Sequence, residues 1–296
     1  MKKNKVLSII ALVLMLSLAF AACTQNEPAG EQKTEFDFGK DITVVARDAA
    51  SGTRGAFHEI MGIIVKENDT EVDKLVVGAL EFDGTDKVIT AVEGDKYGIG
   101  YISLGSVSDR IKAVSVNGAE PAVENVKSGV YSVSRPFILV TKGTESDIIK
   151  DFLSFTESAQ GQQITKDMKY IGAADSPSEY TASGMSGTIK IAGSTSVTPL
   201  MEKLQEAYRE LNPDVTFEMQ SNGSSQGIKA ALDGSYDIGM SSRELKEEES
   251  SQLNRHVLAI DGIAVIVNKE NPKSDLAPED ITKIYTGEIT KWSEVK

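Results

Sequence analysis

Three short segments of the chain combine small hydroxyl residues, each next to a glycine, with the start of a helical pattern. They are Ser51-Gly52-Thr53, Ser194-Thr195-Ser196 and Ser224-Ser225. One such hydroxyl is explained by N-capping, in which its oxygen accepts a backbone N–H bond. Three together predict more, because a helix N-terminus carries about half a positive charge and free N–H donors that bind anions. We therefore expect a small oxyanion to bind where these turns meet.

Arg47 stands just upstream of the first turn and adds a candidate cation. A guanidinium can pair with two oxygens of a tetrahedral anion, and the neighbouring glycine lets the backbone approach a ligand closely. A surface ion pair is the alternative role for this arginine, and the residues alone leave both open. Hydroxyls, backbone N–H groups and one guanidinium form the predicted site.

The elements that must position these side chains alternate between strand and helix patterns. The β-rich run 42–46 leads into the first turn, and apolar residues with helical spacing follow it from 56 to 64. Strand-like residues 188–192 precede the second turn, and one apolar helix face follows it over 197–211. Strand, tight turn and helix in this order are typical of an α/β protein.

Other runs fit the same fold class. Residues 215–219 alternate as in a half-buried strand, and 173–186 are small, polar and aperiodic, which indicates an internal linker. The remaining predictions are strands over 98–104, 111–116, 136–141, 237–240 and 263–268 and helices over 147–155 and 278–285.

Composition excludes several classes of function. The 296 residues carry a net charge of −13, which argues against a nucleic-acid binder because that function needs a basic surface. One cysteine excludes an intramolecular disulfide and any site with several cysteine ligands. His58, assigned to the polar side of its helix, and His256 have no spaced metal-binding partner, so neither a metal nor a cofactor is expected.

The N-terminus reads as an export signal. Lys2, Lys3 and Lys5 precede the apolar run 6–22, and small residues stand before Cys23. A short transmembrane helix is the alternative, but this pattern favours a signal peptide over residues 1–22. Residues 20–23 resemble a bacterial lipobox, with Phe20 where leucine is usual, so Cys23 is the predicted lipidation site. Residues 23–39 are then the tether of the lipid anchor.

Several segments resemble the phosphate-binding protein of the bacterial high-affinity phosphate ABC importer. The matching segments are 46–57 (ARDAASGTRGAF), 98–106, 123–141, 188–200 (TIKIAGSTSVTPL), 220–233 (QSNGSSQGIKAALD), 237–245 (DIGMSSREL), 259–268 and 281–295. The resemblance implies a two-lobed periplasmic-binding-protein fold of the Venus-flytrap type. Each lobe would be a mixed sheet flanked by helices, with ligand in the cleft between the lobes.

The resemblance also implies which residues bind phosphate: Arg47, Ser51, Gly52, Thr53, Thr195, Ser196, Ser224 and Ser242. Ser242 departs from the family pattern, which often has an aspartate there to accept a hydrogen bond from protonated phosphate and help reject sulfate. Ala49 replaces the acidic residue that often orients the pocket arginine. Arg54 and Arg243 are expected to flank the site and add positive field.

The matching segments stand in swapped order. In the family, the part that is similar to 187–296 comes first and the part that is similar to 40–172 follows, which indicates a circular permutation joined through 173–186. A truncated tandem is the alternative. The implied lobes comprise 132–260, and 40–131 together with 261–296.

The implied function is an extracytoplasmic lipoprotein that captures inorganic phosphate and delivers it to ABC permease subunits, as a monomer on the outer face of the cell membrane. The alternatives are a binding protein for sulfate or molybdate, and a phosphate sensor without transport. A secreted hydrolase of phosphate esters is less favoured, because no nucleophile with a base or metal stands out.

Overall fold

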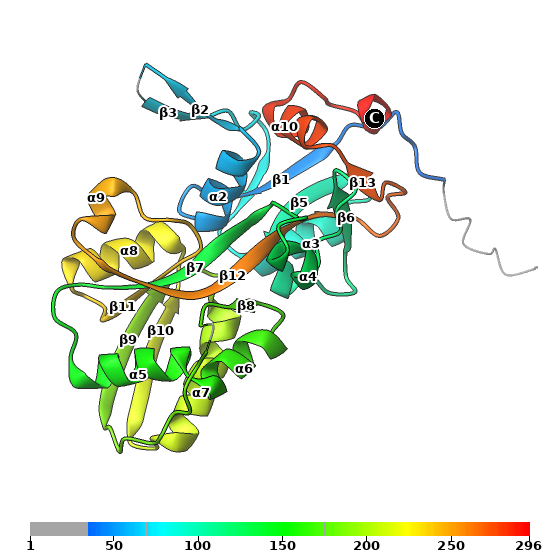
Figure 1. The fold of residues 1–296 in the computed structure, drawn as a ribbon. Coiled ribbons are helices and arrows are strands. Elements are labelled where there is room, and N and C mark those ends of the chain that lie inside the picture. The colour runs from blue at the N-terminus through cyan, green and yellow to red at the C-terminus, as the bar shows by residue number, and fades with distance from the viewer. Residues whose placement is uncertain (1–34, 69, 175) are drawn as a thin grey trace, which may run out of the picture. The chain divides into compact units, whose positions relative to one another are not determined.

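The computed structural model describes residues 35–68, 70–174 and 176–296, and Asp37–Lys296 form one compact unit (Figure 1). The predicted signal peptide 1–22, Cys23 and most of the tether 23–39 lie outside the described residues. Among the helices that are described, none has the length and apolar character needed to cross a membrane.

One mixed sheet of eleven strands runs through the unit (Figure 1). Its main path is β10 (Val215–Ser221), β9 (Gly187–Gly193), β11 (Ile238–Ser241), β7 (Ser134–Thr141), β12 (Asn254–Val267), β5 (Gly98–Ser103), β1 (Thr43–Arg47) and β4 (Leu80–Phe82). Beside this path lie β6 (Lys112–Val116), β8 (Ile171–Gly172) and β13 (Asp275–Leu276). The strands β1, β4 and β5 pair in parallel, as do β9, β10 and β11.

The long strand β12 changes partners along its length. Up to Gly262 it pairs antiparallel with β7, and from Ile263 onward it pairs with β5 and β6. We call β7–β11 with their helices the β9 half, and β1, β4, β5, β6 and β13 with their helices the β1 half. Because β12 belongs to both, the two halves share one sheet. The division into lobes at 131/132 and 260/261 stays a prediction.

Helices cover the sheet in both halves (Figure 1). The β1 half carries α2 (Gly52–Ile60), α3 (Thr85–Gly94), α4 (Val123–Lys127) and α10 (Pro278–Thr286). The β9 half carries α5 (Asp147–Glu157), α6 (Ala159–Asp167), α7 (Thr198–Leu211), α8 (Ser224–Asp233) and α9 (Glu247–Ser250). A separate hairpin of β2 (Ile64–Glu67) and β3 (Thr70–Asp73) extends from the end of α2.

Helix α7 shows why the periodic segments form as predicted. Leu200, Leu204 and Tyr208 recur every four residues, Met201 lies beside them on the same face, and all four are fully buried in the core of the β9 half. Leu211, assigned to the same face, is 38% exposed because the helix ends there, beyond the edge of the core. Local periodicity therefore predicts the face of a helix better than the depth of its last turn.

Several features differ from the sequence-based expectations, and α3, α4, α6 and β4 are among the elements that were not expected. The strand expected at 263–268 begins nine residues earlier, at Asn254, because its first part pairs with β7. The hairpin β2–β3 was not anticipated at all. His58 is fully buried rather than on a polar helix face, because Asp73 of β3 covers that side of α2.

Candidate functional site

The eight residues singled out from the sequence meet at one place in the sheet. From the β1 half come Arg47, at the end of β1, and residues 51–53, which begin α2. From the β9 half come the turn after β9, the first residue of α8 and the residue after β11. Those positions are Thr195, Ser196, Ser224 and Ser242. All eight positions are buried except Thr195, which is partly exposed.

Direct contacts join the two halves at this place. Thr53 Oγ1 lies 2.9 Å from Ser196 Oγ, and Arg47 Nη2 donates to Thr195 Oγ1 at 2.9 Å. A Cβ atom placed on Gly52 would lie 2.3 Å from Ser224 Oγ, so only glycine allows this approach. The two halves therefore touch through hydroxyls, one guanidinium and bare backbone.

The turns differ in what their hydroxyls do. Ser51 is the N-cap of α2 and accepts the Arg54 N–H at 3.4 Å, as the capping explanation requires. Ser224 has another role, since Gly223 is the N-cap of α8 and Ser224 Oγ accepts the N–H of Ser242 at 3.0 Å. The N-cap of α7 is Val197, without a side-chain cap. Capping thus accounts for only one of the three turns.

Ser242 sits among hydroxyls rather than charges. Ser194 Oγ donates to Ser242 Oγ at 2.9 Å, and Ser224 Oγ lies 3.3 Å from the same oxygen. Within the described ranges, no carboxylate forms a hydrogen bond with any of these three hydroxyls. This group of three hydroxyls is neutral and can both donate and accept hydrogen bonds.

Arg47 is oriented by backbone carbonyls instead of an acidic side chain. Its Nε donates to Phe82 O and its Nη2 donates to Asp83 O, each at 3.1 Å. These carbonyls belong to the last residue of β4 and to the loop that follows it, so the guanidinium is held without an acidic residue at position 49. Burial lowers the pKa of the Arg47 guanidinium from its usual value, while the nearby Asp48 carboxylate raises it. The guanidinium stays charged at neutral pH.

A buried chain of hydrogen bonds, which we call the relay, connects the Arg47 backbone through Tyr101 and His58 to Asp73. The Arg47 N–H donates to Tyr101 Oη at 3.1 Å, and Tyr101 Oη lies 3.2 Å from His58 Nε2. His58 Nδ1 lies 3.0 Å from both carboxylate oxygens of Asp73. Burial lowers the pKa of His58, and the relay fits a neutral imidazole whose Nδ1–H donates to Asp73. Burial alone would raise the pKa of Asp73, but hydrogen bonds from His58 and Arg54 hold it well below its usual range.

The two flanking arginines are paired rather than free to add positive field. Arg54 binds Asp73 through Nε at 2.9 Å and also pairs with Glu81. Arg243 contacts both carboxylate oxygens of Glu249 at 2.8 Å. Carboxylates neutralise the charges of Arg54 and Arg243, whereas the Arg47 guanidinium contacts a hydroxyl of the site, that of Thr195.

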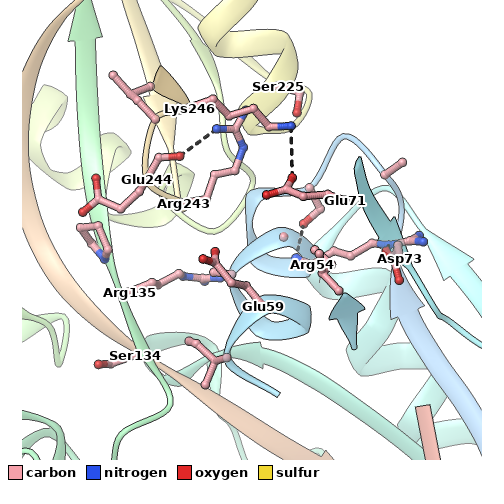
Figure 2. A pocket seen from close by; sticks show the side chains of 18 residues that line it. Arg54, Glu59, Glu71, Asp73, Ser134, Arg135, Ser225, Arg243, Glu244 and Lys246 are labelled. Atoms are coloured by element: carbon pink, nitrogen blue, oxygen red, sulfur yellow. Dashed lines mark hydrogen bonds and ion pairs between the residues drawn. The ribbon is translucent and has the colours of Figure 1, made fainter. Parts of the chain in front are cut away.

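A cavity of about 740 Å³ opens beside the eight site residues (Figure 2), and one of them, Ser51, belongs to its lining. Four cationic and four acidic side chains line it: Arg54, Arg135, Arg243, Lys246, Glu59, Glu71, Asp73 and Glu244. Lys246 Nζ of the β9 half lies 3.8 Å from Glu71 Oε2 of the hairpin, so an ion pair spans this cavity. The lining is balanced in charge, unlike the acidic chain as a whole.

Arg135 is a buried charged residue that the sequence reasoning missed. Its Nη2 donates to Asp261 Oδ2 at 3.0 Å, and both side chains are almost completely buried at the point where β7 and β12 pass between the halves. Burial raises the pKa of Asp261 to about 6, although Arg135 and Ser103 act against that shift. An arginine within an otherwise apolar strand was the available signal.

The described residues contain no group of three or more histidine, cysteine, aspartate or glutamate side chains that could hold a metal ion. His256 lies 2.8 Å from Glu145 and far along the chain from the hydroxyl turns.

Comparisons with known proteins show the family to which the chain is related. A protein-family model described as a PBP superfamily domain matches residues 22–160 and 178–296 of the sequence. The phosphate-binding protein PstS 2 of Streptococcus pneumoniae is 40% identical over 296 residues, with all of both chains covered. PstS 2 of Streptococcus agalactiae is 42% identical over 298 residues, covering 100% of this chain and 99% of its own.

Two further comparisons add a solved structure and a partial match. The crystal structure of a phosphate-binding protein of a phosphate ABC transporter from Streptococcus pneumoniae aligns with a TM-score of 0.72 at 43% identity. It covers 86% of this chain and 100% of its own. The phosphate-binding protein PstS of Bacillus subtilis is 33% identical over only 113 residues, which is 37% of this chain and 38% of its own.

Proposed function

Because the chain belongs to the PBP superfamily and, within it, to the phosphate-binding proteins of phosphate ABC transporters, we propose that it captures inorganic phosphate and delivers it to an import permease. It is a binding protein and not an enzyme. The observation that carries the proposal is the meeting of Arg47 with hydroxyls from both halves at one buried place.

The proposed binding residues are the eight at the contact between the halves. The Ser51 hydroxyl accepts the Arg54 backbone N–H, and each of the other hydroxyls there bonds to another hydroxyl or to Arg47. A phosphate between the halves would replace these bonds with bonds to its own oxygens, so the count of hydrogen bonds need not fall. Arg47 would supply the charge-assisted pair, and the first turns of α2 and α8 would add backbone N–H donors.

Closure of two lobes is the proposed mechanism. The lobes comprise 132–260, and 40–131 with 261–296, and the change of partners along β12 at Gly262 and Ile263 supports this boundary. Phosphate would shift the population toward the closed arrangement, because only there do residues of both halves contact it.

The swapped segment order is proposed to be a circular permutation. The two ends of the compact unit lie side by side, since Ser293 N donates to Phe38 O at 2.7 Å and Asp41 forms a bridge with Lys291. Residues 173–186 join the parts that are ends in the family, and Tyr180 within them packs on Phe155 and Tyr208. The end-to-end match to streptococcal relatives and the partial match to the Bacillus subtilis protein fit this order.

We also propose that the protein is extracytoplasmic and anchored through Cys23 after removal of residues 1–22. Two acyl chains on one cysteine would give stable attachment to the membrane, and residues 24–39 would tether the binding unit above it. A monomer is proposed to suffice, because the eight site residues all come from one chain.

Sulfate or molybdate binding is the remaining alternative for this site. Ser242 places a neutral hydroxyl where a carboxylate would reject a fully ionised anion. A phosphate sensor without transport would use the same residues and differ only in its partner.

Calorimetric titration of residues 24–296 with phosphate at pH 7 tests the proposal. We expect one-to-one binding that Arg47→Ala weakens by at least about a hundredfold, because it removes charge-assisted hydrogen bonds worth about 1.5–3 kcal/mol each. Arg209→Ala, at an exposed position on α7, is the matched control and should keep wild-type affinity. Binding of sulfate or molybdate with no heat from phosphate would contradict the assignment of the ligand.

A further inference from the structure

A further hydroxyl residue reaches the site from a segment that the sequence motifs did not mark. Phe82 ends β4, Asp83 and Gly84 form the loop that follows, and Thr85 is the first residue of α3. Thr85 is only 8% exposed. Its Oγ1 lies 3.4 Å from Arg47 Nη1 and 3.5 Å from Thr195 Oγ1. Thr85 thus stands between the guanidinium and the hydroxyl through which the two halves touch.

Capping does not account for this hydroxyl. The N-cap of α3 is Gly84, and no side chain caps the helix. The Thr85 hydroxyl is instead turned toward Arg47 and Thr195, and within the described ranges those two side chains are its hydrogen-bond partners. Because buried hydroxyls are normally hydrogen-bonded and this one bonds only there, its contribution lies at the site.

The three nitrogens of Arg47 show what Thr85 adds. Nε and Nη2 are held by the carbonyls of Phe82 and Asp83, which accept hydrogen bonds but cannot donate them. Nη1 has the Thr85 hydroxyl as its partner, the only side chain of the β1 half that accepts from this guanidinium among the described residues. A hydroxyl can accept from Nη1 and at the same time offer its proton toward Thr195 or an anion oxygen.

We infer that Thr85 is a positioning residue of the anion site, which fixes the Arg47 guanidinium against Thr195 and so sets the geometry of the closed site. The inference rests on the proposed function for its effect on phosphate, while its effect on Arg47 is independent of any ligand. Residues 82–85 would then do what an acidic residue at position 49 does in the family pattern. Two backbone carbonyls and the Thr85 hydroxyl accept hydrogen bonds from the Arg47 guanidinium and so orient it.

Two substitutions of Thr85 separate positioning from simple packing. Thr85→Val keeps the shape and removes the hydroxyl, and we expect it to weaken phosphate binding about tenfold in calorimetry. Thr85→Ser restores the hydroxyl and should bind within about twofold of wild type. Thr90→Val is the matched control, because Thr90 is an exposed residue of the same helix whose hydroxyl accepts only from Arg110. It should leave the affinity unchanged.

A measurement without ligand tests the same inference directly. Nitrogen-15 spectra of the arginine side chains report how firmly a guanidinium is held, and the Arg47 signals are assigned by their loss in Arg47→Lys. We expect Thr85→Val to shift the Arg47 Nη signals and speed the rotation of that guanidinium, and Thr85→Ser to leave both near wild type. Unchanged Arg47 signals in Thr85→Val would overturn the inference. If wild type does not bind phosphate, the proposed function fails and these spectra still decide the role of Thr85.

Discussion

Thr53 Oγ1 and Ser196 Oγ lie 2.9 Å apart, although 143 residues separate them in the chain and they belong to different halves of the sheet. Thr53 is in the first turn of α2, and Ser196 is in the turn between β9 and α7. Both are buried. Each hydroxyl is a donor and an acceptor, so each can exchange this mutual bond for a bond to an anion oxygen.

The first prediction is that these two hydroxyls act together in phosphate binding. We expect Thr53→Val and Ser196→Ala each to weaken binding about tenfold, because each removes one hydrogen bond to a charged ligand. In the double variant the losses should not add, since the residues are in direct contact and share one ligand. Calorimetry of the four proteins gives the coupling.

A surface pair of the same chemistry is the control for this cycle. Thr188 and Thr216 also place two hydroxyl oxygens 2.8 Å apart, between β9 and β10, but on an exposed part of the sheet. Thr188→Val and Thr216→Val should leave phosphate affinity unchanged, alone and together. Additive losses for Thr53 and Ser196 would show that the two hydroxyls do not share a ligand.

The second prediction concerns the close approach at Gly52. Gly52→Ala would bring a methyl group to 2.3 Å from Ser224 Oγ and 3.0 Å from Ser242 Oγ, so the halves would have to move apart. We expect phosphate affinity to fall by at least about a hundredfold, because contacts from both halves are needed at once. Gly55→Ala in the same helix meets its nearest atom at an ordinary 3.5 Å and should bind normally. Equal effects of the two variants in calorimetry would contradict this account.

The third prediction concerns the choice between anions. Ser242→Asp places a carboxylate beside the Ser194 and Ser224 hydroxyls, where it can accept a hydrogen bond from the P–O–H group of hydrogen phosphate and repel sulfate, which has no proton to donate. We expect sulfate affinity to fall more than phosphate affinity, by about tenfold or more in the ratio of the two. Ser242→Asn is the neutral control of similar size, and competition titrations at pH 7 measure both ratios. A constant ratio in Ser242→Asp would show that this position does not set selectivity.

The three hydroxyl turns could be found from the sequence because their signal is local. Each turn joins a strand to a helix, and the residue types within it already indicate free donors and close backbone approach. Arg47 was found for the same reason, since it lies only a few residues from Ser51. What the residues could not supply was the contact of these turns with one another, which depends on strand order in the sheet.

Thr85, Arg135 and His58 escaped sequence reasoning because their roles depend on distant partners. Thr85 follows a strand of only three residues, too short to mark by alternation, and bonds to Arg47 across 38 positions. Arg135 needs Asp261 to explain its burial. His58 was assigned to a polar helix face from its neighbours in sequence, whereas Asp73 and Tyr101 bury it from outside that helix.

The relay from Asp73 through His58 to Tyr101 also sets the sign of a pH effect. Burial lowers the pKa of His58 below its ordinary value, so the folded protein keeps this imidazole neutral while the unfolded chain takes up a proton. Below pH 6.5 the unfolded state therefore binds more protons than the folded state, and stability falls as pH falls. The raised pKa of Asp261, about 6, acts with the opposite sign between roughly pH 4 and 6.

The fourth prediction isolates His58 from these opposing effects by comparing variants. We expect the melting temperature of wild type to drop more between pH 7 and pH 5 than that of His58→Gln, because the variant lacks the group that charges on unfolding while Asp261 is unchanged. Asp73 does not interfere, since hydrogen bonds keep its pKa well below this window. His256→Gln removes the other histidine and should retain the His58 contribution to the drop. A drop in His58→Gln as large as in wild type, measured by calorimetric melting in matched buffers, would mean that His58 is not held neutral by the fold.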